Sequence, residues 1–354
     1  YLFIHIITIE MKNIRFIVII AILIIIIIIK NSFYSQTVVK EIKRNLNYYL
    51  SITNIVRDDI DIDFVHKFKE VDTSLFKRKT SPWLASATID IDNSGEELIF
   101  LGGANEQDDV LLKYDAKENK MKNVIQNTNL SSTDATYAAV AVDFDKDGYV
   151  DLIVARQTGV FLYKNNNGIF TKKTLIKENK KSFPIAISVA DYNKDKHLDI
   201  YVSKFINPVY MKAFTFNNPK HAQPNILLQG DKDGNFKDVT KQTNSAGLQN
   251  TFTSTFVDLD KDGYPDLVIA PDTGEVEIYK NNNGKHFTRK KVDSGYGFWM
   301  GIGVGDIDND GDQDLYMTNL GNTVARTKMF RGDLKPSQRL NYDHILLRND
   351  GDFN

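Results

Sequence analysis

Short apolar runs separated by polar turns recur along most of the chain. The clearest unit holds four such runs, at residues 136–142, 152–155, 160–164 and 170–175. Alternating or continuous apolar runs of this length, bounded by turn residues, are typical of β-strands. The turns between the last three are Gln157–Gly159 and Asn165–Gly168. The pattern therefore predicts four consecutive antiparallel strands in this stretch.

The same unit returns further along the chain. After an Asp-rich turn at residue 258, a turn at 271–274, an apolar run at 276–280 and a second turn at 281–284 follow in the same order. Asn-Gly before an aromatic run is a strong hairpin signal. Asp-rich turns begin at residues 90, 143, 191, 258 and 306. Spacings near fifty residues are typical of β-propellers of four-stranded blades. We therefore expect an all-β propeller with five visible blades.

The turn between the first two strands of each unit carries the candidate chemistry. In GDIDNDGDQDL, carboxylates occupy positions 1, 3, 5 and 9 (Asp306, Asp308, Asp310 and Asp314), and Gly311 occupies position 6. Hard oxygen ligands around a sharp turn are what calcium requires, and the carbonyl at position 7 adds a ligand. An EF-hand would have a glutamate at position 12 and a following helix, whereas DLYMT after this turn reads as a strand.

Four loops in the same register give the candidate calcium ligands. They are Asp143, Asp145, Asp147, Tyr149 and Asp151; Asp191, Asn193, Asp195, His197 and Asp199; Asp258, Asp260, Asp262, Tyr264 and Asp266; and Asp306, Asp308, Asp310, Asp312 and Asp314. The Asp191 loop has Asn193 and no glycine, so we expect it to bind most weakly. A degraded copy at Asp90 runs one residue short into Glu97, which leaves its calcium binding open. The expected role of the ion is structural.

These repeats resemble the FG-GAP/VCBS repeat family, the calcium-loop propellers that include the integrin α head and cartilage acidic protein. The resemblance is carried by AVDFDKDGYVDLIVA, FVDLDKDGYPDLVIA and GIGVGDIDNDGDQDLYMTN, and by the blade-end phrase at Asn225–Thr240. It covers about Phe64 to Asn354 and implies a propeller, often of seven blades. Phe68–Asp72 is similar to the fourth strand at Phe236–Thr240, so we expect it to complete the last blade and remove an open edge.

The N-terminus has a different pattern. Met11, Lys12 and Arg15 precede an unbroken apolar run, Phe16–Ile29. A short basic segment before such a run is typical of an export signal, and the run is shorter than the roughly 20 residues of a membrane span. Both a cleaved signal and an anchor through residues 14–29 stay open. We expect a signal segment at 1–36, a helical stalk at 37–60 and the propeller at 61–354, in a secreted, periplasmic or cell-surface protein.

Composition narrows the class of function. A net charge of -2 argues against a nucleic-acid surface, and the absence of cysteine excludes disulfides, thiolate zinc sites and a cysteine nucleophile. The histidines are scattered, and no hydrolase or phosphate-loop motif is present. We therefore expect no enzyme but a binding or adhesion module for protein or glycan ligands. A propeller hydrolase or lyase with an open calcium site, or a cell-envelope assembly factor, is the alternative.

Two long connections between second and third strands are the candidate ligand surface. Residues 205–224 and 321–341 replace turns of only a few residues in the other units, and they carry aromatic residues and arginine. Long irregular loops are commonly functional, and these would lie opposite the calcium loops. Insertions packed on the propeller are the alternative. Arg331-Gly332-Asp333 in the second loop fits a turn better than an integrin-binding tripeptide.

Overall fold

A computed structural model describes residues 61–62, 70–73, 76–79, 85–178, 182–206, 223–247, 249–272, 274–321, 341–351 and 353. All of them fall in the unit Asp61–Asn354. The expected signal segment at 1–36 and stalk at 37–60 lie outside these residues. The described part is all-β apart from one short helix, α3 (Thr240–Thr243). No helix within it is long and apolar enough to cross a membrane.

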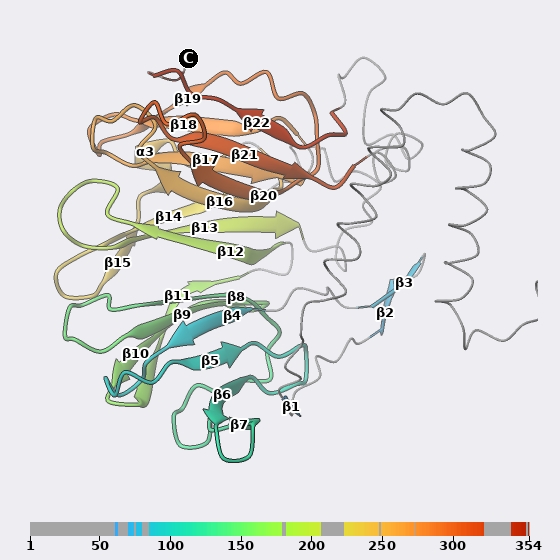
Figure 1. Cartoon of the computed structure of the whole chain (residues 1–354), viewed down its shortest axis with the longest axis vertical. Coiled ribbons are helices and arrows are strands. Elements are labelled where there is room, and N and C mark those ends of the chain that lie inside the picture. Colours follow the sequence, from blue (N-terminus) through green and yellow to red (C-terminus); the bar gives the residue numbers. More distant parts are fainter. Residues whose placement is uncertain are drawn as a thin grey trace, which may run out of the picture. The chain divides into compact units, whose positions relative to one another are not determined.

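Three sheets have the predicted four antiparallel strands (Figure 1). The second sheet consists of β8 (Thr136–Val142), β9 (Asp151–Arg156), β10 (Gly159–Asn166) and β11 (Ile169–Lys177). The third consists of β12 (Ser182–Ala190), β13 (Asp199–Ile206), β14 (Ile226–Gly230) and β15 (Phe236–Asp238). The fourth consists of β16 (Thr251–Val257), β17 (Asp266–Pro271), β18 (Glu277–Asn281) and β19 (Phe287–Lys290). The expected all-β class and four-stranded blades are confirmed.

The first and last sheets differ from this pattern. The first contains β4 (Ser86–Ile89), β5 (Leu98–Leu101), β6 (Val110–Asp115) and β7 (Lys120–Asn123), with β1 (Asp61–Ile62) added parallel to β7. The last contains β20 (Trp299–Gly305), β21 (Asp314–Asn319) and β22 (Ile345–Leu347) among the described residues.

The expectation that Phe68–Asp72 completes the last blade is wrong. In the described residues, β2 (Glu70–Thr73) pairs with β3 (Phe76–Lys79) in a two-stranded hairpin, and β22 has β21 as its described neighbour. A hairpin between adjacent segments closes a very short loop, which costs far less chain entropy than pairing with a strand at the other end of the domain. The segment therefore pairs with its neighbour β3, although its sequence is similar to that of Phe236–Thr240.

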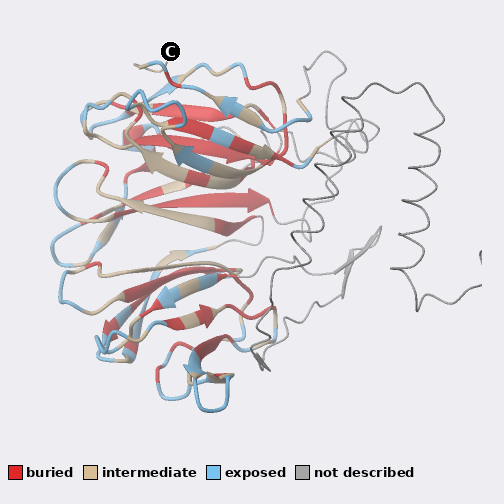
Figure 2. Ribbon diagram, in the orientation of Figure 1, coloured by how far each residue is buried: buried red, intermediate tan, exposed pale blue. Residues whose placement is uncertain are grey.

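Alternation along the strands produces the packing between sheets. In β9, Leu152 and Val154 face the first sheet, whereas Ile153 and Ala155 face the third. The first strands β4, β8, β12, β16 and β20 each contact the next one in chain order. Buried residues therefore concentrate in the strands and exposed residues in the turns (Figure 2). Apolar burial between successive sheets is the main stabilising term of this arrangement.

The far face of the last sheet departs from the repeat. Leu259, Val268 and Ile278 are 3%, 0% and 7% exposed where the fourth sheet packs on the last one. Their counterparts in the last sheet, Ile307, Tyr316 and Leu346, are 55%, 43% and 47% exposed. The repeat positions that are covered at each earlier interface are thus open to solvent at the last sheet.

Candidate metal centres

Each Asp-rich turn joins the first strand of a sheet to the second and is shaped by its own carboxylates. The position-1 aspartate accepts a hydrogen bond from the position-6 amide in all five loops, at Asp90–Gly95 2.7 Å, Asp143–Gly148 3.0 Å, Asp191–Lys196 2.8 Å, Asp258–Gly263 2.9 Å and Asp306–Gly311 2.9 Å. Position 6 is left-handed throughout, which glycine adopts without penalty. Lys196 has φ 72°, so the Asp191 loop bears the steric cost that glycine avoids in the other four.

Position 5 fixes the second half of the loop. Its carboxylate accepts from the amide of position 7, at Asp147–Tyr149 2.9 Å, Asp195–His197 2.8 Å, Asp262–Tyr264 2.8 Å and Asp310–Asp312 2.8 Å. These bonds hold position 7 close to the carboxylates, where sequence analysis expects its carbonyl to bind the ion. That carbonyl role stays a prediction.

Position 9 anchors the loop to the sheet. Asp266 is fully buried, and its two oxygens accept from the amides of Leu259 at 2.9 Å and Asn281 at 2.7 Å. Asp151, Asp199 and Asp314 make the equivalent pairs of bonds. Since the second donor lies at the end of the third strand, the carboxylate ties three strands together. The ninth residue is therefore a structural anchor whether or not it also binds metal.

The asparagine that follows the third strand was missed by sequence analysis. The Nδ2 of Asn281 donates to the carbonyl of Tyr192 in the preceding sheet at 2.8 Å. Asn165 and Asn349 donate in the same way to Ile91 at 3.0 Å and Leu259 at 2.7 Å. A signal existed, because all three stand at the start of an Asn- and Gly-containing turn that follows the apolar residues of the third strand. These three bonds join the second, fourth and last sheets to the loop of the sheet before each of them.

Position 4 makes a second connection, to the loop that follows. Asn93 Nδ2 donates to the Gly148 carbonyl at 2.8 Å, Lys146 Nζ to the Lys196 carbonyl at 2.6 Å, Lys194 lies over the Tyr264 ring at 4.3 Å, and Lys261 pairs with Asp312 at 2.7 Å. The five loops therefore form one linked series along the same end of the sheets.

Burial acts strongly on the ninth residues. Desolvation raises the pKa of Asp151 to about 6, and of Asp199 and Asp266 to about 7, although the two backbone amides at each oppose the shift. Nearby carboxylates add to the rise in pKa. They stand at positions 3 and 5 for Asp151 and Asp266, and at positions 5 and 1 for Asp199. In Asp314 the hydrogen bonds from Asn349 and Ile307 dominate and lower the pKa. In the Asp143, Asp191 and Asp258 loops, the buried ninth residue thus carries a charge that is costly to maintain without a cation.

Three loops bring their carboxylates together as a metal cage would. Each offers three oxygens within 4.8 Å of one another, from Asp143, Asp145 and Asp151; Asp258, Asp260 and Asp262; and Asp306, Asp308 and Asp314. The Oδ1 atoms of Asp143, Asp145 and Asp258 are buried and have no hydrogen-bond partner. A buried carboxylate oxygen without a partner is strongly destabilising unless a cation satisfies it. These residues fit a calcium ion in both donor type and spacing.

The Asp191 loop is not among these groups, although all of its residues are described. Asp195 Oδ2 accepts from Asn193 Nδ2 at 2.8 Å and from Gln229 Nε2 at 3.3 Å, so its oxygens are already in use. A further group of carboxylates that could hold a metal ion consists of Asp308, Asp310 and Asp350. Of these three, Asp350 is the residue that sequence analysis did not select. All three of these residues are exposed.

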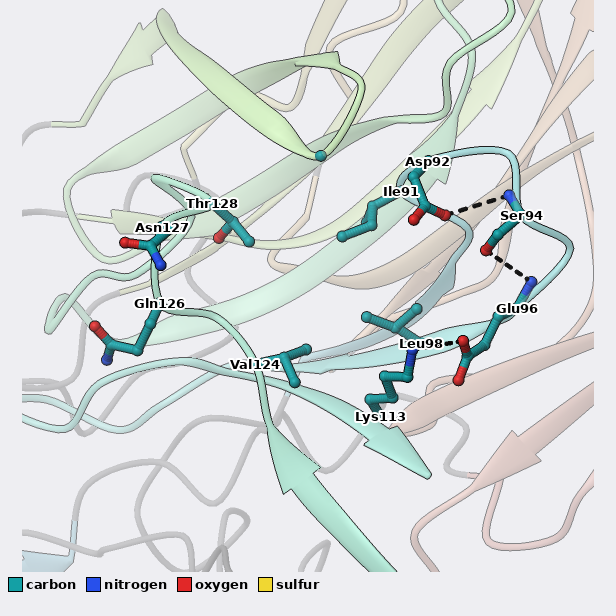
Figure 3. Close-up of a pocket in the computed structure, with 11 residues that line it drawn as sticks. Ile91, Asp92, Ser94, Glu96, Leu98, Lys113, Val124, Gln126, Asn127 and Thr128 are labelled. Carbon is teal, nitrogen blue, oxygen red and sulfur yellow. Dashed lines mark hydrogen bonds and ion pairs between the residues drawn. The ribbon is translucent and has the colours of Figure 1, made fainter. Parts of the chain in front are cut away.

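The Asp90 loop differs from the other four at the ninth position and lines a cavity. Ile89 pairs with Leu98 as Val142 pairs with Asp151, so Leu98 and not Glu97 is the ninth residue. The expected one-residue shortening is therefore wrong, and the anchoring carboxylate is absent. The loop instead lines a cavity of about 350 Å³ (Figure 3). Its walls combine apolar and polar side chains, among them Ile91, Leu98, Val124, Asp92, Ser94, Glu96, Lys113 and Gln126.

The opposite end of the sheets neutralises its own charges. Arg156 Nη1 lies 2.7 Å from Asp109 Oδ2, and both side chains are almost wholly buried. Lys204 Nζ donates to Glu178 Oε2 at 2.7 Å in a similarly buried pair. The expected ligand loops 205–224 and 321–341 start from this end, but residues 207–222 and 322–340 lie outside the described part of the chain.

Comparisons with known proteins agree with the repeat. A family model described as FG-GAP-like repeat matches residues 143–202 and 258–317. The chain is 24% identical over 211 residues to integrin alpha-6 of Gallus gallus, a match that covers 53% of this chain and 18% of the integrin. The chain thus spans less than a fifth of that curated relative.

Solved structures with related folds include an Agrocybe aegerita lectin that recognises non-reducing terminal N-acetylglucosamine, with 17% identity, a TM-score of 0.43, and coverage of 76% of this chain and 67% of the lectin. The Vibrio cholerae biofilm matrix protein Bap1 is 12% identical, with a TM-score of 0.45, and the likeness covers 83% of this chain and 41% of Bap1.

Proposed function

The chain belongs to the FG-GAP repeat propeller family, and on that premise we propose that it is a calcium-stabilised binding module outside the cytoplasm, without catalytic activity. Calcium is the structural ion of this proposal, and a protein or glycan is the ligand. The observation that carries it is the set of buried carboxylate oxygens without a hydrogen-bond partner in the Asp143 and Asp258 loops. Such oxygens fit a module that acquires its final stability from the millimolar calcium typical of extracellular surroundings.

The loops support a structural rather than a catalytic ion. In the Asp258 loop the ninth residue is held by two backbone amides, and positions 1 and 5 by one each. Carboxylates held in this way suit a closed ion cage, whereas a catalytic metal keeps a position open for substrate. Within the described residues, the strongly buried ion pairs lie at the far end of the sheets from these loops.

The ligand is assigned to the two long connections, 205–224 and 321–341. The test replaces each with the turn Gln157–Thr158 that joins β9 to β10. Binding to an array of glycans and extracellular proteins is measured beside the calcium-dependent melting temperature. We expect binding to be lost while the calcium response is kept. Unchanged binding would overturn this assignment, and turnover of any bound glycan or ester would overturn the non-catalytic proposal.

Export is tested separately. Residues 11–36 are fused to a reporter that is active only after crossing a membrane, and a variant with Lys12→Glu and Arg15→Glu is the matched control. Activity that depends on the two basic residues supports export through this segment. An inactive fusion would overturn export through this segment.

A further inference from the structure

One position on the third strand reaches into every complete Asp loop. Lys164 on β10 and Lys280 on β18 stand directly before Asn165 and Asn281, whose amides bind the ninth aspartate. Gln229 and Arg348 occupy the same position in the third and last sheets. The repeat therefore presents two lysines, one neutral amide and one arginine at equivalent places, which makes an internal comparison.

Each of the two lysines is bonded to one oxygen of the third-position carboxylate of its loop. Lys164 Nζ is bonded to Asp145 Oδ2 and lies 3.4 Å from Asp147 Oδ2. Lys280 Nζ is bonded in the same way to Asp260 Oδ2 and lies 3.9 Å from Asp262 Oδ2. Asp145 keeps its other oxygen, Oδ1, buried and without a hydrogen-bond partner. Each lysine thus neutralises part of the charge of its loop, and in the Asp143 loop Asp145 Oδ1 stays available to an ion.

The other two loops show what replaces the lysine. Gln229 contacts Asp195 at 3.3 Å in the Asp191 loop, where an asparagine already replaces the third-position carboxylate. Arg348 Nη1 is 3.8 Å from Asp308 and is held more closely by Asp350, at 2.8 Å. The full positive charge is therefore placed close to the two loops of Asp143 and Asp258, and it is absent where the loop carries one carboxylate less.

We propose that Lys164 and Lys280 are tethered counter-ions, which keep their loops folded when calcium is low and weaken the binding of calcium to them. This inference rests on the proposed calcium binding. Clustered carboxylates repel one another at these distances, and one ammonium group relieves that repulsion in the metal-free loop. When a divalent ion enters, the same ammonium repels it, and loop affinity depends on the summed charge of the ligands. The lysine therefore trades calcium affinity for stability without calcium.

The experiment compares Lys164→Met and Lys280→Met with the reciprocal change Gln229→Lys. Lys173→Met is the control, because this lysine of the second sheet donates to the Gly234 carbonyl and Asn235 Oδ1, in the turn between β14 and β15 and outside the four aspartate loops. Melting temperature is recorded in chelator, and terbium binding is followed by tyrosine-sensitised luminescence. Tyr149 at position 7 provides a sensitiser in the Asp143 loop, and Tyr149→Phe assigns the signal to it.

We expect Lys164→Met to lower the melting temperature in chelator by a few degrees and to tighten terbium and calcium binding about three- to tenfold. Gln229→Lys should raise the temperature in chelator and weaken binding to the Asp191 loop, and Lys173→Met should change neither. Unchanged or weaker binding in Lys164→Met would overturn the proposal. If the unmodified protein binds no calcium, the proposed function fails at that point, whereas the chelator measurement still tests the lysines as counter-ions.

Discussion

The two ends of the sheets treat buried charge in opposite ways. At the far end, Arg156 and Asp109 form a pair at 2.7 Å with almost no exposure, and Lys204 and Glu178 form a second. At the loop end, three or four carboxylates share each of the four complete turns, and lysine pairs with two of them in the Asp143 and Asp258 loops. The far end neutralises its buried charges with ion pairs between its own side chains. The other keeps an excess of negative charge.

This difference locates the sensitivity of the molecule to its surroundings. Buried ion pairs respond little to salt or to divalent ions, because solvent does not reach them. A cage of carboxylates responds to calcium and to protons alike, since both neutralise it. Changes in solution composition should therefore alter the loop end, and only substitutions should alter the far end.

The largest effect is expected at the far end. Asp109→Ala or Arg156→Met leaves one buried charge without its partner and should lower the free energy of unfolding by about 3–5 kcal/mol. Burial already raises the pKa of Asp109 in spite of Arg156, which shows how costly this charge is. Urea denaturation should give the same loss in calcium and in chelator. A loss that appears in calcium alone would contradict the comparison.

The next effect is expected at the loop end and only in calcium. Calcium at about 100 times its dissociation constant should stabilise each loop by about 2.7 kcal/mol through mass action. Asp306→Ala or Asp310→Ala should remove this share in calcium and hardly change the melting temperature in chelator. Asp233→Ala, in an exposed turn outside the cages, is the matched control. Equal losses in both conditions would mean that the carboxylates act only through their hydrogen bonds.

The repeat explains why so much of this arrangement follows from sequence. The aspartate spacing predicts the loop, and the β-branched residues after it predict the second strand, so β9 at Asp151–Arg156 lies where the pattern places it. Position 9 is also readable, because Asp151 and Asp266 recur at one spacing. Local signals suffice wherever each repeat solves the same problem with the same residues.

What sequence analysis missed depends on contacts between repeats. Leu98 replaces the ninth aspartate, and only the strand register reveals that Glu97 is not its counterpart. Asn281 reads as an ordinary turn residue, whereas its side chain reaches Tyr192 in another sheet. The pairing of Arg156 with Asp109 likewise joins two sheets. No spacing within one repeat encodes such contacts.

Acidity should distinguish the loops at a smaller scale. Burial raises the pKa of Asp266 to about 7 and of Asp151 to about 6, so protons compete with calcium as pH falls through this range. In the metal-free protein, stability should instead fall as pH rises. A carboxyl group whose pKa is raised in the folded state contributes stability that is present below its unfolded pKa of about 4 and is lost as pH rises through 6 to 7. Each group changes stability by at most about 1.4 kcal/mol per pH unit.

The melting temperature should therefore rise with pH between 5 and 8 in the presence of calcium and fall with pH in its absence. Asp266→Asn removes one titrating group and should flatten both slopes. The Asp306 loop is the internal control, because hydrogen bonds lower the pKa of Asp314 and its calcium response should persist to lower pH. Parallel slopes with and without calcium would show that the titrating groups are not the carboxylates that bind the ion.

The smallest effect sharpens the comparison by holding the chemistry constant. Lys113 and Glu96 at the loop end form a lysine–glutamate pair at 2.7 Å, as Lys204 and Glu178 do at the far end, but with 48% and 42% of their side chains exposed. Exposed pairs gain little because water and salt screen them. Lys113→Met should shift the melting temperature by at most about 2 °C, and less in high salt. Lys204→Met should shift it several times more and independently of salt, because Glu178 would be left buried and unpaired. Equal shifts for the two variants would show that burial does not set the strength of these pairs, and that it is not the difference between the two ends.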